Sequence, residues 1–401
     1  MPDPIFDDAR LAPIYDPFDP DRSDLDAYVD LVAEAGAARV LDLGCGTGTL
    51  AIRLAAAGTE VVGIDPAAAS VDVARGKPGA DAVRWVVGTA ADAPAGWADL
   101  AVMTANVAQV FLTDEDWSAT LRHLRRSLAP GGLLAFETRR PEARAWEDWG
   151  RRYAPETIDV PGTGEVTQEY TLLAVDLPLV SFRFTHTFHS DGAVVVSDST
   201  LRFRDRAEVT ADLLAAGFAV EEVRDAPDRP GREHVFLARR RPWTVRPAGA
   251  DDETHLWRGL ARATAWRGGE ERPVEVLRAD GDVARYVEGW TPDQGGVVAV
   301  GGDGEVLGVA WLRLLPADGP GYGFVAEDVP ELSIGVAPSA RGAGVGSALL
   351  AVLLERARRD GRRAVSLSVE RDNVGARRLY DRAGFVRVGA VGGADTLLCE
   401  L

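Results

Sequence analysis

Cysteine, histidine and lysine are scarce in this sequence of 401 residues, and long apolar runs are absent. The two cysteines, Cys45 and Cys399, stand far apart and form no metal-binding or redox motif, so we expect reduced thiols and no metal site. No stretch approaches the ~18 consecutive apolar residues of a membrane-spanning helix, which argues against a membrane protein.

Basic charge is also in deficit, because 44 lysine and arginine residues stand against 62 aspartate and glutamate residues, a formal net charge of −18. Binding to nucleic acid or anionic lipid needs a basic face, so neither is expected as the main task. The chain begins with an acidic, proline-rich stretch unlike a signal or transit peptide, and we expect a cytoplasmic protein. Its length and its 46% of hydrophobic residues predict two domains. Nothing in the sequence indicates an oligomeric state.

Apolar strand-like runs alternate with helix-like runs from residue 25 to about residue 140. The strands are expected at 38–44, 60–65, 82–88, 98–106 and 133–139. Buried strands separated by helices indicate a parallel sheet covered on both faces, with a ligand crevice at the carboxyl ends of its strands. Residues 155–205 instead resemble antiparallel strands, two of them joined by a hairpin at Asp191–Gly192. A helix at 207–218 and a closing pair of strands follow, so the first domain is expected to span residues 1–240.

The second domain, residues 241–401, is expected to begin with a strand at 243–247 and helical segments up to about residue 267. A hairpin that turns at Asp303–Gly304 leads to an apolar strand and a helix that ends near residue 360. A strand, a helix and one final strand complete the expected domain. The two halves share no repeated sequence.

The first half contains a glycine-rich loop, with Gly44, Gly46 and Gly48 between a predicted strand and a predicted helix. Glycine lets a backbone adopt positive φ and approach a ligand closely. The G-x-G-x-G spacing differs from the G-x-G-x-x-G of dinucleotide-binding folds. Asp65 ends the next strand, where a carboxylate can accept hydrogen bonds from both hydroxyls of a ribose. The glycines alone are also compatible with a mere tight turn, but strand, loop, helix and acid together favour a ligand site.

The chain from about residue 10 to residue 240 resembles the class I S-adenosylmethionine-dependent methyltransferases. The resemblance is carried by VLDLGCGTG (40–48), VVGIDPA (61–67), GTAADAP (88–94), MTANVAQVF (103–111) and SLAPGGLLAFET (127–138). It implies an α/β domain with a Rossmann-like, seven-stranded sheet, an antiparallel β insertion, and S-adenosyl-L-methionine (SAM) as cofactor. The residues that it implies around the methionine part of the cofactor are Gly44, Cys45, Gly46 and Gly48.

The same resemblance assigns further roles along the sequence. It implies that Asp65 binds the ribose, that Thr89 and Ala90 flank the adenine, and that Asn106 faces the methyl group. Many relatives have aspartate at the position of Thr89, so Asp92 is an alternative contact for the adenine. Residues 13–16 (PIYD) resemble an N-terminal flap that closes over the cofactor.

Two histidines and two tryptophans are other candidate functional residues in this half. His186 shares one strand face with phenylalanines, whereas His189 lies on the other face, and packing or solvent exposure explains both better than catalysis. Trp146 and Trp149 are spaced for one helix face, where core packing is favoured over a substrate platform. Methyl transfer needs mainly alignment and a desolvated pocket, so a marked general base is not required.

A second glycine-rich loop in the second half contains Arg341, Gly344 and Gly346, between an apolar strand and a helix with leucines at helical spacing. The free N–H groups and partial positive charge of a helix N-terminus suit a pyrophosphate. The loop lacks the Lys-Ser/Thr ending of a P-loop, so nucleoside triphosphate hydrolysis is not indicated. For the loop alone, a glycine-rich helix start without any ligand remains the alternative.

Residues 243–401 resemble the GNAT superfamily of acetyl-coenzyme A-dependent N-acetyltransferases. The resemblance is carried by PELSIGVAPSARGAGVGSALL (330–350) and SVERDNVGARRLYDRAGFVRVG (368–389). It implies an α+β domain with a mixed, mostly antiparallel sheet and acetyl-coenzyme A (acetyl-CoA) as cofactor. The residues that it implies at the cofactor are Ile334, Val336, Arg341, Gly342, Gly344, Val345, Gly346, Ser347 and Asn373.

Two residues are the candidates for acetyl-transfer chemistry. The resemblance places Tyr380 to protonate the leaving thiolate, because its hydroxyl can donate near the sulfur, and a buried aromatic without catalytic role is the alternative. Glu331 is expected to collect the proton of the amine through water, with Glu327 and Asp328 behind it. Attraction of a cationic amine by this acidic segment is the alternative.

These observations predict a bifunctional enzyme that transfers a methyl group in one domain and an acetyl group to a small amine or protein amine in the other. The alternative is an acetyltransferase whose methyltransferase-like half only senses SAM or supports the structure. A non-enzymatic scaffold is disfavoured because both halves keep intact cofactor motifs. No motif identifies either acceptor.

Overall fold

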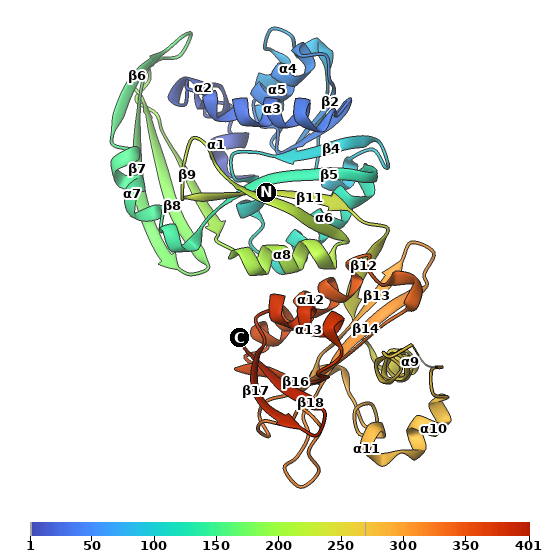
Figure 1. Cartoon of the computed structure of the whole chain (residues 1–401). Helices are drawn as coiled ribbons and strands as arrows, with labels where there is room; N and C mark the ends of the chain where they lie inside the picture. The colour runs from blue at the N-terminus through green and yellow to red at the C-terminus, as the bar shows by residue number, and fades with distance from the viewer. Residues whose placement is uncertain (1, 269) are drawn as a thin grey trace. The chain divides into compact units, whose positions relative to one another are not determined.

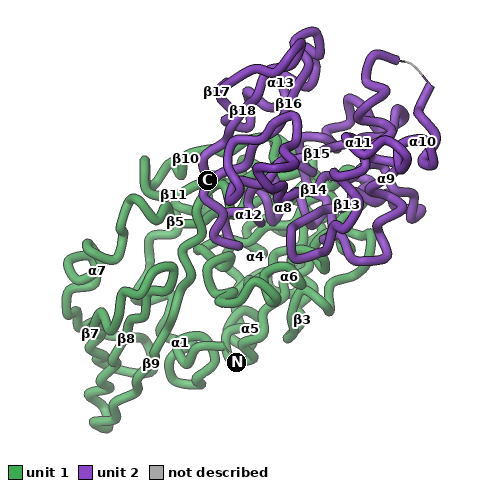
Figure 2. The backbone as a smooth tube through the Cα atoms, turned by 90° about the horizontal axis from the view of Figure 1, so that it is seen from below, with its two compact units in different colours: residues 1–209, 220–240 green, residues 210–219, 241–401 purple. Residues whose placement is uncertain are grey.

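The computed structural model describes residues 2–268 and 270–401, and the chain divides into two compact units (Figures 1 and 2). The first unit comprises residues 1–209 and 220–240, and the second comprises residues 210–219 and 241–401. The expected domains, 1–240 and 241–401, stay a prediction. No helix within the described ranges is long and apolar enough to cross a membrane.

A seven-stranded sheet in the order β10-β11-β5-β4-β1-β2-β3 forms the centre of the first unit. Its strands are β1 (Arg39–Leu43), β2 (Glu60–Asp65), β3 (Val83–Val87), β4 (Ala98–Met103), β5 (Leu128–Arg139), β10 (Phe218–Asp225) and β11 (Glu233–Arg240). The strands β1 to β5 pair in parallel, and β11 runs antiparallel to β5. The sheet confirms the expected Rossmann-like fold, and β4 ends three residues before the predicted strand end at Asn106.

Helices cover this sheet because the parallel strands are apolar on both faces. The helices in this part of the chain are α1 (Pro4–Asp7), α2 (Tyr15–Phe18), α3 (Asp26–Ala35), α4 (Thr49–Ala56), α5 (Ala68–Arg75), α6 (Asp114–Ser127), α7 (Trp146–Arg152) and α8 (Arg206–Ala215). Of these, α7 packs on the antiparallel insertion described next, and α8 begins in the first unit and continues into the second. Short 3₁₀ turns connect them: η1 (Ala12–Ile14), η2 (Ser23–Leu25), η3 (Ala80–Ala82), η4 (Ala90–Asp92), η5 (Val107–Val110) and η6 (Pro141–Ala143). Figure 1 shows α3 and α4 on one side of the sheet and α6 on the other. Thr113 caps α6 by accepting a hydrogen bond from the Asp116 N–H group.

The antiparallel insertion is a separate four-stranded sheet in the order β6-β7-β8-β9. Its strands are β6 (Glu156–Val160), β7 (Gly164–Asp176), β8 (Leu179–Phe188) and β9 (Val194–Arg202). The predicted hairpin is confirmed, since Gly192 has φ of 72° between β8 and β9. Trp146 and Trp149 are buried against Val180 and Phe203, which confirms core packing for both tryptophans.

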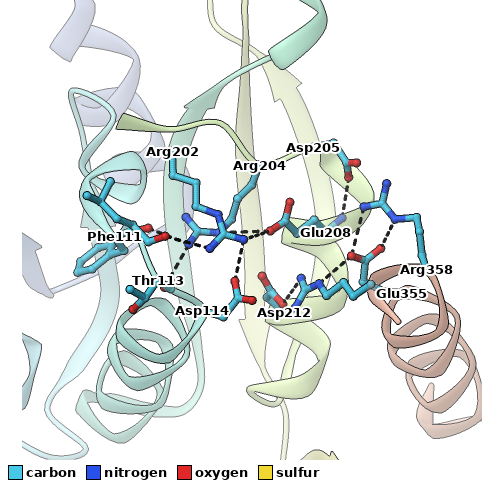
Figure 3. A network of polar contacts seen from close by, with 12 residues as sticks. Phe111, Thr113, Asp114, Arg202, Arg204, Asp205, Glu208, Asp212, Glu355 and Arg358 are labelled. Carbon is cyan, nitrogen blue, oxygen red and sulfur yellow. Dashed lines mark hydrogen bonds and ion pairs between the residues drawn. The ribbon is translucent and has the colours of Figure 1, made fainter. Parts of the chain in front are cut away.

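Two arginines join the end of β9 to the segment before α6 (Figure 3). The Arg202 guanidinium donates to the Leu112 carbonyl and pairs with Asp114 and Glu208. The Arg204 guanidinium is buried and donates to the Phe111 carbonyl. Hydrogen bonds from charged donors are stronger than those between neutral groups, so these contacts hold the end of the insertion against the segment before α6.

The second unit is built on another seven-stranded sheet, in the order β12-β13-β14-β15-β16-β18-β17. Its strands are β12 (Trp243–Pro247), β13 (Gly296–Gly301), β14 (Val306–Arg313), β15 (Glu331–Val336), β16 (Ala364–Glu370), β17 (Val386–Val391) and β18 (Ala394–Glu400). Only β15 and β16 pair in parallel among these described strands, which confirms a mixed, mostly antiparallel sheet. The expectation of one final strand is wrong, because the chain turns at Gly392, with φ of 56°, and returns as β18.

Helices on this sheet are α9 (Glu253–Thr264), α10 (Val274–Ala279), α11 (Gly281–Ala284), α12 (Val345–Arg359) and α13 (Val374–Arg382), with 3₁₀ turns η7 (Ala250–Asp252), η8 (Pro292–Gln294) and η9 (Pro338–Ala340). Leu349, Leu350 and Leu353 of α12 are fully buried against the sheet, and Leu354 is partly buried. Close packing of α9 requires Gly259, because a Cβ atom there would lie 2.2 Å from a Val309 methyl carbon.

The parallel strands β15 and β16 diverge at the centre of this sheet. Their register pairs Glu331 with Ser366 alone. Residues Leu332–Val336 keep their pairing with β14 on the other edge. After Glu331, the backbone N–H and C=O groups of β15 that face β16 therefore have no strand partner among the described residues. Buried backbone groups are nearly always hydrogen-bonded, so a ligand is a suitable partner for them.

Candidate functional site

The glycine loop of the first unit follows β1 and begins α4. The N–H groups of Gly44 and Cys45 donate to the Ile64 carbonyl at 2.7 and 3.2 Å, which ties the loop to β2. Gly44 has φ of 76°, and a Cβ atom there would lie 2.5 Å from a Val107 methyl carbon. Gly48 has φ of 80°, and a Cβ atom there would lie 2.4 Å from the Trp85 ring. Only glycine fits these two positions, so the loop backbone lies directly against its neighbours.

Two buried aspartates flank the loop. The Asp65 carboxylate accepts hydrogen bonds from the Gly46 N–H group at 2.9 Å and the Ala67 N–H group at 2.8 Å. Neither oxygen of Asp42 has a hydrogen-bond partner among the described residues. Burial, reinforced by the nearby Asp65 carboxylate, raises the pKa of Asp42 to about 7. An unpartnered buried carboxyl fits a cationic ligand, and the methionine part of SAM carries an ammonium and a sulfonium.

The predicted flap contacts this loop through Asp16. Its carboxylate accepts a hydrogen bond from the Thr47 hydroxyl at 2.7 Å and pairs with the Lys77 ammonium at 2.6 Å. Thr47 belongs to the glycine loop, so the segment that contains Tyr15 and Asp16 lies next to the loop. Burial raises the pKa of Tyr15 to about 12.

The segment predicted at the adenine follows β3. Thr89 and Asp92 form a capping box around η4, in which the Asp92 carboxylate accepts the Thr89 N–H group at 2.8 Å. The Asp92 carboxylate thus closes its own turn, and Ala90 is buried. The structure leaves the adenine contact of Thr89 and Ala90 as a prediction.

Asn106 lies after the end of β4 in a strained backbone segment. Ala105 and Asn106 have φ of 55° and 62°, which is uncommon for residues other than glycine. The Asn106 N–H group donates to Glu137 at 3.1 Å, and its side-chain amide donates to Glu233 at 3.3 Å. No sequence pattern connects either glutamate to Asn106, because they lie on β5 and β11, far from Asn106 along the chain.

Of the two insertion histidines, His186 is packed in the interior and His189 is exposed. The His186 ring is fully buried beside Phe18, its Nε2 lies 3.0 Å from the Gln168 amide oxygen, and burial lowers its pKa to about 4. The His189 ring bonds to the Thr167 hydroxyl at 2.7 Å. Packing thus accounts for His186 as the strand pattern predicts.

In the second unit, a cavity of about 1180 Å³ opens where β15 and β16 diverge. Ten predicted site residues line it: Glu331, Ile334, Val336, Arg341, Gly342, Gly344, Gly346, Ser347, Asn373 and Tyr380. The exception is Val345, whose side chain is fully buried in the core, because it is the first residue of α12 and faces the sheet. Asn373 caps α13, since its side-chain oxygen accepts the Ala376 N–H group at 3.1 Å.

Glu331 is the buried carboxylate of this cavity. Its Oε2 accepts hydrogen bonds from the Tyr286 hydroxyl and the Gly323 N–H group, both at 2.9 Å. Burial raises its pKa above the ordinary value for glutamate. The expected supporting acids lie elsewhere: Glu327 accepts the Ala317 N–H group, and the exposed Asp328 pairs with Arg363.

Aromatic rings and a phenol complete the cavity. Tyr286 and Tyr322 are stacked with ring centroids 6.2 Å apart, and Tyr322 is half exposed. Tyr380 is buried beside Phe385, and burial raises the pKa of its hydroxyl, which therefore stays protonated at neutral pH. The tyrosines from the segment before β15 were not identified from the sequence, because no spacing connects them to Glu331.

Three arginines also line this cavity: Arg341, Arg378 and Arg382. None of them forms an ion pair within the ranges that the structure describes. Arg377 of the same helix, by contrast, pairs with Asp381 and Asp395. Uncompensated cations at a cavity in an acidic chain favour an anionic ligand.

The units match two families of known proteins. Residues 40–132 match the family model described as a methyltransferase domain, and residues 262–385 match that of the acetyltransferase (GNAT) family. The chain therefore joins a methyltransferase domain to a GNAT acetyltransferase domain. SAM and acetyl-CoA are the cofactors that these two families imply.

Curated relatives of this chain include mycothiol acetyltransferases. The one from Paenarthrobacter aurescens is 38% identical over 112 residues, which cover 28% of this chain and 33% of the relative. The one from Salinispora tropica is 32% identical over 232 residues, which cover 57% of this chain and 66% of the relative. The chain thus spans about a third of the first of these relatives and under two thirds of the second.

Solved structures similar to the methyltransferase domain include DesVI of Streptomyces venezuelae, with 20% identity and a TM-score of 0.47. The alignment covers 57% of this chain and 97% of that one. KedS8 of Streptoalloteichus, described as a sugar N-methyltransferase, has 19% identity and a TM-score of 0.47 over 57% of this chain and 92% of its own.

Proposed function

We propose that this chain is a bifunctional transferase: its domain 1–240 transfers a methyl group from SAM, and its domain 241–401 transfers an acetyl group from acetyl-CoA to an amine. The observation that carries the proposal is the cavity at the β15–β16 divergence, which brings Glu331, Tyr380 and the glycine loop together. Residues distant in sequence converge there with the chemistry that acetyl transfer requires.

The cavity walls suit the carrier of the acetyl group. The unpaired edge of β15, with Ile334 and Val336, offers backbone groups to a pantetheine arm. The amides from Arg341 to Ser347 stand before and within the first turn of α12, where a pyrophosphate is stabilised. Acetyl-CoA supplies an activated thioester there. The three unpaired arginines add positive charge for its phosphates.

Glu331 and Tyr380 carry the proton movements of this proposal. An amine must lose a proton to become a nucleophile, and a buried carboxylate with a raised pKa is suited to collect it. Tyr286 and Gly323 hold that carboxylate in place. The Tyr380 hydroxyl donates its proton to the thiolate that leaves as the C–S bond breaks.

A small-molecule amine is the proposed acetyl acceptor. The matched relatives are named mycothiol acetyltransferases, which favours a small molecule over a protein amine. The carboxylate of Glu331 beside the stacked Tyr286 and Tyr322 rings suits a cationic amine, which carboxylates and aromatic faces both attract. A cytoplasmic location stays a prediction.

In the methyltransferase domain, the proposal places SAM on the loop from Gly44 to Gly48, with Asp42 facing its cationic end and Asp65 its ribose. The cofactor supplies an electrophilic methyl group. The residues present fit SAM, because the Asp42 carboxyl is buried without a hydrogen-bond partner among the described residues and Gly44 has no side chain to cover the loop backbone. The chain's own task is to align the acceptor and exclude water.

A substitution at Tyr380 tests the assignment of two separate chemistries. Incubation with a metabolite pool and both isotope-labelled donors, read by mass spectrometry, reports acetyl and methyl transfer in one sample. Tyr380→Phe is expected to lower acetyl transfer by about 10²-fold, because the proton donor is lost, and to leave methyl transfer within about twofold. An equal fall of both activities would show that the two sites are not independent.

A further inference from the structure

The segment after β4 holds a buried amide oxygen that no described residue satisfies. Asn106 is 2% exposed, and its Oδ1 has no hydrogen-bond partner in the part of the chain that the structure describes. Burying a polar atom without a partner costs about 1–3 kcal/mol. The left-handed backbone of Ala105 and Asn106 adds local strain. Such costs are typical of sites that are arranged for a ligand.

The orientation of the Asn106 amide follows from its neighbours. Its Nδ2 lies 3.3 Å from Oε1 of Glu233, a carboxylate oxygen that accepts hydrogen bonds. The NH₂ group must therefore point at Glu233, and Oδ1 points away from it. Glu233 is itself buried, and the same Oε1 accepts a hydrogen bond from the Arg229 guanidinium at 2.8 Å, so this oxygen acts as an acceptor. The free acceptor of Asn106 is thus fixed in direction.

Glu137 fixes the backbone of the same residue. Its Oε1 accepts the Asn106 N–H group, and its Oε2 accepts the Tyr28 hydroxyl. Burial and the nearby Glu233 carboxylate raise the pKa of Glu137 to about 7. Both Glu137 oxygens thus accept hydrogen bonds from protein donors, and the carboxylate supports the backbone of Asn106.

The location of Asn106 connects it to the methyl donor. The next residue, Val107, has its methyl groups against Gly44 so closely that a Cβ atom on that glycine would lie 2.5 Å away. Asn106 therefore follows the carboxyl end of β4 immediately beside the glycine loop, at the edge of a parallel sheet where ligands bind.

We propose that Oδ1 of Asn106 accepts an N–H hydrogen bond from the methyl acceptor, and that this acceptor is a primary or secondary amine. The inference rests on the proposed methyl transfer and specifies its substrate class. An amine keeps an N–H group for Asn106 while its lone pair is free to attack, and it reacts as the neutral base. A hydroxyl acceptor needs a base in contact with it, and both nearby carboxylates already hold Asn106.

The step balances without a further reactant. The acceptor nitrogen forms the new N–CH₃ bond as the S–CH₃ bond breaks, the sulfonium becomes a neutral thioether, and the methylated ammonium releases its proton to water. Asn106 contacts the acceptor and is the catalytic residue, whereas Glu137 and Glu233 are positioning residues.

Sinefungin is the probe that tests the hydrogen bond, because it carries a primary amine where SAM carries its methyl sulfonium. Its dissociation constant is compared with that of S-adenosylhomocysteine, which lacks any such donor, by calorimetry on the full chain. Asn106→Gly removes the side chain yet tolerates the positive φ. In this variant we expect the dissociation constant of sinefungin to rise about tenfold and that of S-adenosylhomocysteine to change less than about twofold.

Glu233→Gln provides the second variant. A glutamine NH₂ group can donate to Oδ1 of Asn106, so the amide loses its fixed direction, and sinefungin is again expected to weaken selectively. Glu221→Gln is the matched control, since Glu221 pairs with Arg239 on β11, at the sheet's other end, and should change neither affinity. If both ligands weaken equally in both variants, or if neither changes, the proposal is wrong. If wild type binds neither ligand, the proposed methyltransferase function itself fails.

Discussion

Replacement of Asp42 by asparagine should remove a strong pH dependence from the stability of the first unit. An aspartate in the unfolded chain releases its proton near pH 3.8, whereas Asp42 in the folded chain keeps it until about pH 7. Between these values the folded state holds more protons than the unfolded state, so the contribution of Asp42 to stability falls as pH rises. At ~1.4 kcal/mol per pKa unit, the interval from pH 5 to pH 8 corresponds to a loss of about 3 kcal/mol.

Urea unfolding of the full chain at pH 5 and pH 8 measures this loss, with hydrogen exchange of the peptide that contains β1 assigning the transition to the first unit. Between pH 5 and pH 8, the free energy of unfolding of the variant is expected to rise by about 3 kcal/mol relative to that of wild type. Saturating SAM should reduce that rise, because a cation beside Asp42 lowers its pKa.

Asp99→Asn is the matched control for this measurement. The Arg39 guanidinium holds the pKa of Asp99 below its ordinary value, so folded and unfolded states are both ionised above pH 5. The difference in free energy of unfolding between Asp99→Asn and wild type should therefore be the same at pH 5 and pH 8. If Asp42→Asn behaves like this control, the buried, unpartnered state of Asp42 is refuted.

Three further predictions follow from the two sites. Arg378→Gln combined with Arg382→Gln should weaken acetyl-CoA about tenfold in calorimetry but 3′-dephospho-acetyl-CoA much less, whereas Arg362→Gln, outside the cavity, should change neither; equal weakening of both ligands would exclude phosphate recognition. Gly44→Ala should lower the free energy of unfolding by about 1–3 kcal/mol and abolish SAM binding, and a variant with unchanged SAM affinity would contradict the close packing of that loop. Glu331→Gln should reduce kcat for acetyl transfer about 10²-fold and abolish its rise with pH, and a retained pH profile would assign the proton to another group.

Local patterns in the sequence were sufficient to predict the central elements of both units. Apolar runs bounded by glycines predict the parallel strands, because such strands are buried on both faces. The hairpin at Asp191–Gly192 follows from turn chemistry alone, and its glycine has φ of 72°. The pair β17 and β18 was read as one strand because β17 is largely exposed and interrupted by Gly389, which leaves no clear alternation.

Contacts between distant residues limited the prediction of the sites. Glu331 was identified, but its hydrogen bond from Tyr286 joins residues 45 positions apart and no motif indicates it. The resemblance indicates Asn106, but the hydrogen bond from its side-chain amide to Glu233 joins residues 127 positions apart, and no motif indicates it. Asp92 was an alternative adenine contact, yet its carboxylate closes a local capping box, a competing use that the sequence also permits.

Titration of the full chain with each donor by isothermal calorimetry tests the central claim most directly. The account predicts one site for SAM and one site for acetyl-CoA, and the heat of either titration should be unchanged when the other donor is saturating. If only acetyl-CoA binds, the methyltransferase domain has a structural role and the account is wrong for that half. Competition between the two donors for one site would also contradict the account.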